Sequence, residues 1–275
     1  MSKKVGIQGI KGSFHHLVAM DYYNKDVAVT EHMSFHDLAQ KLALKETDVA
    51  VMAIENSIAG SILPNYTLIN EYNLTITGEH YTPVNMNLMA LKGQEIKDIK
   101  KVFSHPMALL QCKEFFKKHP HIKLIEDADT AEAAKRISEE GLMKVAAVAS
   151  PVAAEMYGLD ILAKEIHTIK SNTTRFLILD TEMQKPNGEI LDKASLKFDL
   201  KSERGSLVSV LNILRDCDLD MTKIQSLPII DEPWKYSFFV DVIFEGPEDL
   251  EKAIDVLKLM TEELKVLGVY KNRLV

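Results

Sequence analysis

The stretch VAVMAIENSIAGS, residues 49–61, decides the fold class. Its first six residues are all apolar, which is typical of a strand that is buried on both faces of a sheet. The run ends at Glu55, Asn56 and Ser57, so polar side chains follow directly on a buried strand. A capped turn accounts for these polar residues as well as a binding site does, and the pattern alone leaves both interpretations open.

Short apolar runs and helical patterns alternate on both sides of this strand, up to about residue 180. Further strands are predicted at 5–7, 27–29, 102–103, 123–125, 145–148 and 177–179. Helices are predicted at 13–23, 35–42, 106–118, from 129 and from 151. Strands that alternate with helices of this length predict an α/β fold, an open sheet with mainly parallel pairing.

The pattern changes after residues 183–193, which are predicted to be a linker. Beyond it, strands are predicted at 194–200, 221–230, 234–244 and 268–271, and helices at 205–216 and 249–266. This is the β-α-β-β-α-β order of a ferredoxin-like fold. The sequence therefore predicts one domain over 1–182 and a second over 194–275.

Composition and charge exclude several classes of protein. The 275 residues are 46% hydrophobic and 27% charged, the balance of a soluble globular protein. A formal net charge of −7 disfavours binding to nucleic acids or anionic membranes, because phosphates would be repelled. No apolar run reaches the roughly 18 residues of a membrane helix, and no signal-peptide core is visible. Cys112 and Cys217, the only cysteines, are far apart in the chain, which favours a reducing cytoplasm.

Serine stands at several predicted helix starts, after a glycine or an apolar strand. These serines are Ser13, Ser61, Ser104 and Ser150. In an open α/β sheet the strand-to-helix turns meet at the edge where ligands bind, and helix N-termini offer free N–H donors to an anion. Together they predict a carboxylate site, although plain helix capping explains any one of them.

The segment SNTTRF, residues 171–176, places two hydroxyls and a guanidinium at a predicted loop-strand junction. Arginine is the side chain best shaped for bidentate binding of a carboxylate, and a neighbouring hydroxyl can donate to a departing oxygen. A polar loop with a surface arginine is the alternative. No histidine spacing indicates a metal site, and neither a dinucleotide fingerprint nor a nucleophile elbow is present, so we expect no metal and no cofactor.

These motifs, in this order, resemble the prephenate dehydratase family over essentially the whole chain. The matching segments are 9–14 (GIKGSF), 55–61 (ENSIAGS), 102–106 (VFSHP), 146–150 (AAVAS), 157–159 (YGL) and 172–176 (NTTRF). The resemblance implies a two-lobed catalytic domain like the type 2 periplasmic binding proteins, with the second lobe at about 80–165, and an ACT domain after it. It also implies a lyase without chorismate mutase activity that converts prephenate to phenylpyruvate, CO2 and water in phenylalanine biosynthesis.

The resemblance assigns roles to seven of the matching residues. Thr174 matches the catalytic threonine, which would donate to the leaving hydroxyl. Binding of prephenate would fall to Ser13, Asn56, Ser57, Ser104, Asn172 and Arg175. An arogenate dehydratase and a non-catalytic amino-acid sensor remain alternatives, and a proton donor beside an arginine counts against the sensor.

The sequence departs from the family pattern in both domains. Met107 stands where the family commonly has glutamine, and Gln111, one helical turn later, could compensate. The candidate residues for binding L-phenylalanine as an effector are Gly205, Ser206, Leu207, Val208 and Asp220. They would lie at an interface between ACT domains, which usually pair, so a homodimer or homotetramer is expected. The segment 225–228, QSLP, has lost both charged residues of the family's effector motif, which leaves inhibition by phenylalanine open.

Overall fold

The computed structural model describes residues 3–23, 27–183, 188–201, 203–230, 232 and 234–274. The chain packs as two units, Met1–Ile62 with Tyr81–Phe176 and Leu63–His80 with Leu177–Val275. Part of the predicted linker, residues 184–187, lies outside the described residues. None of the described helices has the length and apolar character needed to cross a membrane.

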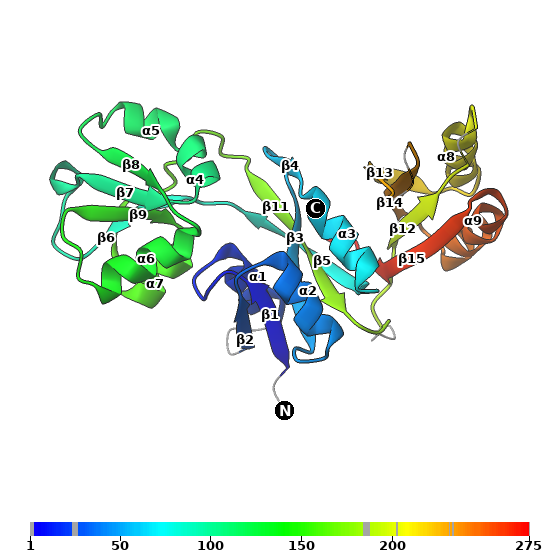
Figure 1. The fold of residues 1–275 in the computed structure, drawn as a ribbon, viewed down its shortest axis with the longest axis horizontal. Coiled ribbons are helices and arrows are strands. Elements are labelled where there is room, and N and C mark those ends of the chain that lie inside the picture. The colour runs from blue at the N-terminus through cyan, green and yellow to red at the C-terminus, as the bar shows by residue number, and fades with distance from the viewer. Residues whose placement is uncertain are drawn as a thin grey trace. The chain divides into compact units, whose positions relative to one another are not determined.

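The first sheet is built around the strand that the sequence predicts at 49–54. The sheet has the order β2-β1-β3-β11-β5, and the short β4 pairs with β3 (Figure 1). Its elements are β1 (Lys4–Gln8), α1 (Phe14–Tyr23), β2 (Ala28–His32), α2 (Phe35–Ala43), β3 (Val49–Asn56), β4 (Gly60–Ser61), β5 (Thr75–Pro83) and β11 (Thr173–Asp180). β1 runs parallel to both β2 and β3, as predicted. β3 is longer than predicted because Glu55 and Asn56 pair with β4.

The second sheet has the order β10-β6-β9-β7-β8 and lies within the predicted second lobe. Its elements are β6 (Asn87–Ala90), β7 (Lys101–Ser104), α4 (Pro106–Gln111), α5 (Lys113–Lys117), β8 (Lys123–Glu126), α6 (Thr130–Glu139), β9 (Val145–Ala149), α7 (Pro151–Tyr157) and β10 (Asp160–Ala163). The predicted helix over 106–118 is two helices, which meet at Cys112. Alternate residues of β9 enter two separate hydrophobic clusters, so helices cover both faces of this sheet.

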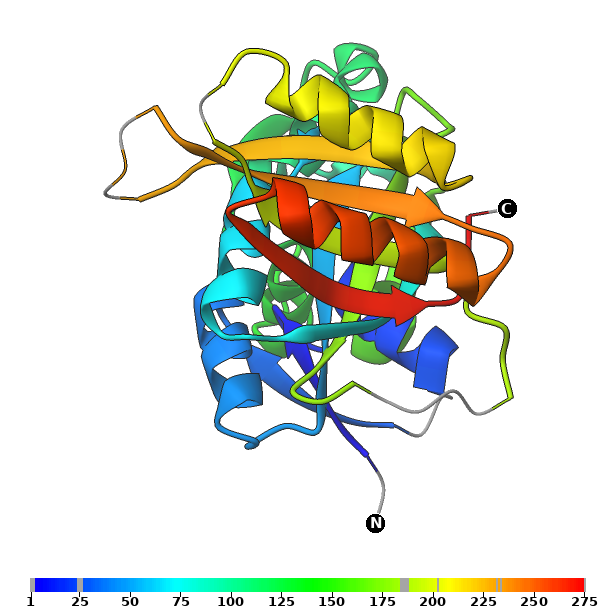
Figure 2. The ribbon, with the colours of Figure 1, turned by 90° about the vertical axis from the view of Figure 1, so that its right-hand side faces the viewer.

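The third sheet has the order β13-β14-β12-β15 and antiparallel neighbours. Its elements are β12 (Lys193–Asp199), α8 (Ser206–Asp216), β13 (Asp220–Pro228), β14 (Tyr236–Ile243), α9 (Pro247–Met260) and β15 (Glu263–Tyr270). The predicted β-α-β-β-α-β order is confirmed, and both helices cover one face of the sheet (Figure 2). The helix predicted to reach residue 266 is wrong at its end, because residues from Glu263 onward pair with β12.

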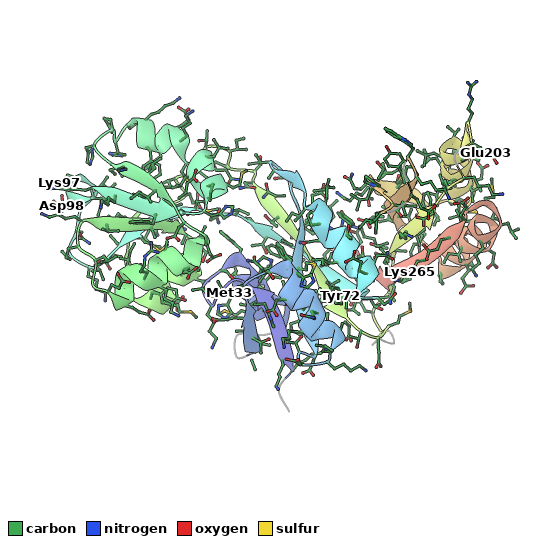
Figure 3. The ribbon with its side chains drawn as sticks, in the orientation of Figure 1. Met33, Tyr72, Lys97, Asp98, Glu203 and Lys265 are labelled. Atoms are coloured by element: carbon green, nitrogen blue, oxygen red, sulfur yellow. The ribbon has the colours of Figure 1, made fainter. Side chains whose placement is uncertain are left out.

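Residues 63–80 precede the predicted linker in sequence, yet they pack with the residues that follow it. They contain α3 (Leu63–Glu71) and most of β5. Lys193 of β12 donates to both carboxylate oxygens of Glu79 at 3.0 and 2.9 Å, and the two side chains are 1% and 0% exposed. The backbone N–H of Arg273 also donates to Glu79, at 2.9 Å. Lys265 of β15 (Figure 3) donates to the side chain of Asn73 at 2.7 Å.

Candidate active site

Two of the motifs that the sequence singles out meet where β3 and β11 lie near each other. The backbone N–H of Ser57 donates to the carbonyl of Thr173 at 2.9 Å, and the N–H of Thr173 donates to Ser57 Oγ at 3.0 Å. Ser57 Oγ donates in turn to the carbonyl of Ser171 at 3.3 Å. β11 therefore begins at Thr173, earlier than predicted, and Thr174 and Arg175 belong to the strand itself.

The side chain of Asn56 connects the two motifs. Its Nδ2 donates to Thr174 Oγ1 at 2.9 Å and to Asn172 Oδ1 at 2.7 Å. Its Oδ1 accepts two backbone N–H groups of the following turn, from Ile58 at 3.0 Å and from Ala59 at 2.9 Å. The amide oxygen is thus fully engaged by donors, so the nitrogen is the end of the amide that faces Thr174.

This orientation of the Asn56 amide determines whether the Thr174 hydroxyl donates or accepts in the hydrogen bond between them. A hydroxyl has one proton to donate and can accept with its lone pairs. Because Asn56 donates to Thr174 Oγ1, the hydroxyl accepts there and its own proton is free for another acceptor. Thr174 is 9% exposed, so this donor lies in a nearly dry surrounding, where hydrogen bonds are stronger than in water.

Gln111, at the end of α4, extends the same network to the second sheet. Asn172 Nδ2 donates to Gln111 Oε1 at 2.8 Å, and both the N–H and the hydroxyl of Thr168 donate to the carbonyl of Gln111, at 2.9 and 3.0 Å. The side chain of Met107, by contrast, is 39% exposed at the start of α4. Gln111 thus supplies a polar contact to the site residues from the helix that begins at Pro106.

With this geometry in place, comparison with known proteins decides the family. A family model described as prephenate dehydratase matches residues 5–184. The chain belongs to the prephenate dehydratase family. A curated relative from Arabidopsis thaliana, arogenate dehydratase/prephenate dehydratase 2 of the chloroplast, is 37% identical over 97% of this chain and 72% of its own.

Two solved structures superpose closely on the chain, each with a TM-score of 0.88. One, described as a novel type of quorum quenching acylase, is 27% identical and covers 98% of both chains. The other is the prephenate dehydratase of Arthrobacter aurescens in complex with L-Phe, which is 23% identical and covers 98% of this chain and 90% of its own. The second likeness concerns the fold alone.

In this member of the prephenate dehydratase family, two of the serines predicted to bind the substrate form hydrogen bonds within the protein. Ser104 is fully buried, and its hydroxyl donates to the carbonyl of Val148 at 2.6 Å, so its only proton is used between β7 and β9. Ser13 is 3% exposed and accepts the N–H of His16 at 3.3 Å, as a capping residue does, which leaves its own proton free, so its assignment to the substrate stays a prediction. The network around Thr174 joins Asn56, Ser57 and Asn172 but includes neither of these serines.

Arg175 does not share a face with Thr174, although the two are adjacent in sequence. Successive side chains of a strand point to opposite faces of the sheet, and both residues lie in β11. Arg175 is 5% exposed, and its guanidinium lies 6.0 Å from the centre of the Tyr81 ring. Its assignment to the substrate carboxylate stays a prediction.

The histidines near the site have structural roles as hydrogen-bond acceptors. His15 Nε2 accepts the N–H of Ala53 of β3 at 3.3 Å, and burial lowers the pKa of His15 to about 3. His16 Nδ1 accepts the N–H of Gly12 at 3.0 Å, and burial, followed by the charge of Lys11, lowers the pKa of His16 below its usual value. Both rings therefore stay neutral at pH 7. Among the described residues no group of three or more His, Cys, Asp or Glu side chains could hold a metal ion.

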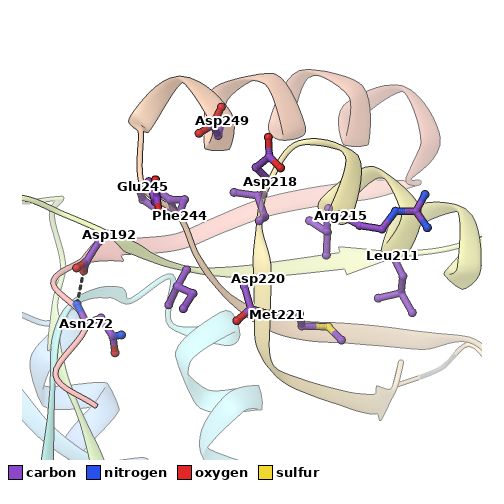
Figure 4. Close-up of a pocket in the computed structure, with 13 residues that line it drawn as sticks. Asp192, Leu211, Arg215, Asp218, Asp220, Met221, Phe244, Glu245, Asp249 and Asn272 are labelled. Atoms are coloured by element: carbon purple, nitrogen blue, oxygen red, sulfur yellow. Dashed lines mark hydrogen bonds between the residues drawn. The ribbon is translucent and has the colours of Figure 1, made fainter. Parts of the chain in front are cut away.

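The candidate effector residues lie at two separate places within one chain. Gly205, with φ +89°, precedes α8, and Ser206 and Leu207 line a cavity of about 170 Å³ together with Trp234 and Tyr236. Asp220 instead lines a cavity of about 870 Å³ at the other end of α8, beside Asp218 and Leu211 (Figure 4). Asp220 and Gly205 thus do not share a cavity within one chain, because the 11 residues of α8 span about 16 Å, and their assignment to an effector stays a prediction.

Proposed function

We propose that this chain is a prephenate dehydratase, an enzyme of phenylalanine biosynthesis that converts prephenate to phenylpyruvate, CO2 and water. The bond between the ring and its hydroxyl breaks, and so does the bond between the ring and its carboxylate. The electrons of the second bond enter the ring, which becomes aromatic, and the carboxylate leaves as CO2. The departing hydroxide takes up a proton and becomes water, so the reaction is neither an oxidation nor a reduction.

Thr174 is the residue that supplies this proton. The hydrogen bond from Asn56 to Thr174 Oγ1, at 2.9 Å, is the observation that carries the proposal, because it leaves the threonine O–H as a donor. A threonine hydroxyl is a weak acid, so the proton moves as the C–O bond breaks rather than before. A donor aimed at the developing charge lowers the barrier in the same way as an oxyanion hole. Thr174 regains its proton from solvent.

The substrate is a dianion, and the protein has a net charge of −7. Local donors must therefore outweigh the repulsion from the whole protein. Asn56 donates to Thr174 and to Asn172, Ser57 Oγ accepts the N–H of the neighbouring Thr173, and Arg175 is the proposed cation for a carboxylate. Ser57 is the exposed member of this group, and a ligand that takes its proton would replace the hydrogen bond from its Oγ to the carbonyl of Ser171.

Replacement of the catalytic threonine tests the proposal. Thr174→Val keeps the shape of the side chain and removes its proton, so we expect kcat for prephenate to fall about 10²–10⁴-fold, the range for loss of a general acid. Thr174→Ser should retain more activity than Thr174→Val. Formation of phenylpyruvate by the purified protein is the assay, and turnover by Thr174→Val at the unaltered rate contradicts the proposal.

Arogenate dehydratase activity is the neighbouring alternative, in which an amine replaces the keto group of the substrate side chain. The relative from Arabidopsis thaliana carries both activities in its name. Steady-state kinetics with prephenate and with arogenate, on one preparation, decide between them. A pure amino-acid sensor would bind one of these compounds without turning it over.

The third sheet and its two helices are the proposed ACT domain, and two such domains would pair through β13. β13 is an edge strand whose residues alternate between exposed and partly buried. Antiparallel pairing of two β13 edges would bring Asp220 of one copy to the Pro228 end of the other, on the side of α8 where Gly205 lies. The effector residues that are apart in one chain would thus come together between two copies, in a homodimer or homotetramer.

We expect L-phenylalanine to bind this interface and to inhibit weakly. The segment 225–228 lacks the two charged residues of the family's effector motif, and an effector shifts an equilibrium only by its different affinities for the two states. Loss of an ion pair that forms in one state weakens the coupling more than the binding. Calorimetry and activity on one preparation test this, and micromolar binding with complete inhibition would contradict it.

A further inference from the structure

The turn between β1 and α1, residues 9–13, makes its contacts with the second sheet rather than only with its own. Ile10 is 7% exposed and belongs to the hydrophobic cluster formed by α6, α7 and β9. Phe14, at the start of α1, packs against the other cluster of the second sheet. The turn thus contacts the cores on both faces of the second sheet.

Two side chains of α7 and its cap hold the backbone of this turn. Ser150 Oγ donates to the carbonyl of Gly12 at 2.6 Å, and the hydroxyl of Tyr157 donates to the carbonyl of Lys11 at 2.5 Å. Burial, followed by the charge of nearby carboxylates, raises the pKa of Tyr157 to about 12, so this hydroxyl keeps its proton at pH 7.

Residues of β2 and α1 accept hydrogen bonds from the backbone of the same turn. The N–H of Lys11 donates to Glu31 Oε1 at 2.7 Å, and the N–H of Gly9 donates to the carbonyl of His32 at 2.8 Å. The N–H of Gly12 donates to His16 Nδ1 at 3.0 Å. Most backbone N–H and C=O groups of residues 9–13 therefore have a hydrogen-bond partner. These partners lie in the first sheet and its helix α1 and in the second sheet's helix α7 with its cap.

At Gly12 there is little room for a side chain between the turn and α7. Its φ is +92°, and a Cβ built on it would lie 3.2 Å from the ring of Tyr157 and 3.3 Å from Ala153 Cα. Any larger residue would push α7 away from the turn. The absence of a side chain at position 12 is thus a condition for the contact.

We infer that this turn is the closing contact between the two sheets of the catalytic unit, and that Tyr157 is the positioning residue that holds it. Thr174 and Asn56 belong to strands of the first sheet, whereas Gln111, which accepts from Asn172, ends a helix that packs on the second sheet. The arrangement of the site therefore depends on how the two sheets are held together. Substrate affinity depends on the fraction of molecules in which the turn contacts the second sheet, here called the closed fraction. The apparent Kd for the substrate rises as this fraction falls. The kinetic part of this inference rests on the proposed function.

Tyr157→Phe removes one donor and keeps the ring against Gly12. We expect KM for prephenate to rise about 3–10-fold, the effect of one hydrogen bond on the closed population, with kcat changed less than about twofold. Ser138→Ala is the matched control, because Ser138 Oγ donates to the backbone carbonyl of Tyr157 at 2.7 Å and does not touch the turn. Ser138→Ala should lower the free energy of unfolding about as much as Tyr157→Phe does, and it should leave KM for prephenate unchanged. An equal rise of KM in both variants overturns the positioning role.

A second measurement does not need the substrate. Hydrogen exchange at the amides of residues 11–13 should be faster in Tyr157→Phe than in the wild type or in Ser138→Ala. Gly12→Ala should speed this exchange further, whereas Gly93→Ala, with φ +80° and open space at its Cβ, should not. Unchanged exchange in both Tyr157→Phe and Gly12→Ala overturns the closing contact. If the wild type does not act on prephenate but the exchange results hold, the proposed function fails and the contact stands.

Discussion

The substitution Asn56→Asp tests the polarity of the site more sharply than removal of a side chain does. The two residues have nearly the same shape, but the amide nitrogen, which donates to Thr174 and Asn172, becomes a carboxylate oxygen that only accepts. Thr174 then donates its single proton to position 56 instead of to the substrate. The contact to Asn172 Oδ1, at 2.7 Å in the wild type, becomes an approach of two acceptors.

The magnitude follows from the bonds that change. A hydrogen bond to a charged group contributes about 1.5–3 kcal/mol, and this bond must break before Thr174 can serve the substrate. That cost alone lowers the rate about 10–100-fold, since 1.4 kcal/mol is about tenfold. Asn172 cannot recover by turning its amide over, because its nitrogen already donates to Gln111. We therefore expect kcat/KM of Asn56→Asp to fall about 10²–10³-fold.

Asn56→Ala is the comparison, since it removes the same two donors but leaves the threonine proton free. It should retain more activity than Asn56→Asp. The new negative charge also repels the substrate, and a series in ionic strength separates this effect, because salt screens repulsion but does not change the polarity of a hydrogen bond. Activity of Asn56→Asp should rise as the pH falls through the pKa of the new carboxyl, because a protonated carboxyl can donate again. Equal activity of Asn56→Asp and Asn56→Ala at high salt would refute the reasoning.

Two further substitutions test the assigned charges. Arg175→Lys keeps the positive charge but loses the planar guanidinium, so we expect mainly a higher KM for prephenate, and this KM should rise further with ionic strength. Unchanged kinetics would place Arg175 outside the site, in agreement with its position on the face of the sheet opposite Thr174. Glu79→Gln leaves the buried Lys193 beside a neutral partner, so the free energy of unfolding, measured by denaturant titration, should fall by about 3–5 kcal/mol. The double variant Glu79→Leu/Lys193→Met removes both charges, and its free energy of unfolding should lie near that of the wild type. Equal losses in the single and double variants would contradict this.

The strands with continuous apolar runs were predictable from the sequence, but their partners were not. The run 49–54 is recognisable because a strand buried on both faces needs apolar residues throughout. The hydrogen bond between Asn56 and Thr174 joins residues 118 positions apart, and it exists because β11 lies beside β3 in the sheet. Local periodicity carries no information on that neighbour. Only the ordered set of motifs pointed to a common site.

The segment 63–83 shows why other elements were missed. β5 reads TITGEHYTP, and its Glu79 would be placed at the surface by any pattern of polar and apolar residues. The residue is fully buried because Lys193, from a distant part of the chain, supplies the opposite charge. Similarly, Thr261–Val266 continues the helical pattern of α9, but pairing of β15 with β12 overrides that local preference.

The side chains that the hydrogen bonds connect to Thr174, those of Asn56, Asn172 and Gln111, are amides, which keep one protonation state across the physiological pH range. A titrating base next to Thr174 would compete for its proton, whereas an amide that only donates cannot. The two histidines of α1, His15 and His16, have lowered pKa values and act as neutral acceptors for backbone N–H groups. Under the proposed function, the Asn56 amide directs the proton of a weak acid, the Thr174 hydroxyl, toward the substrate by fixing which of the two groups donates and which accepts, and an amide does this without a change of protonation state across the physiological pH range.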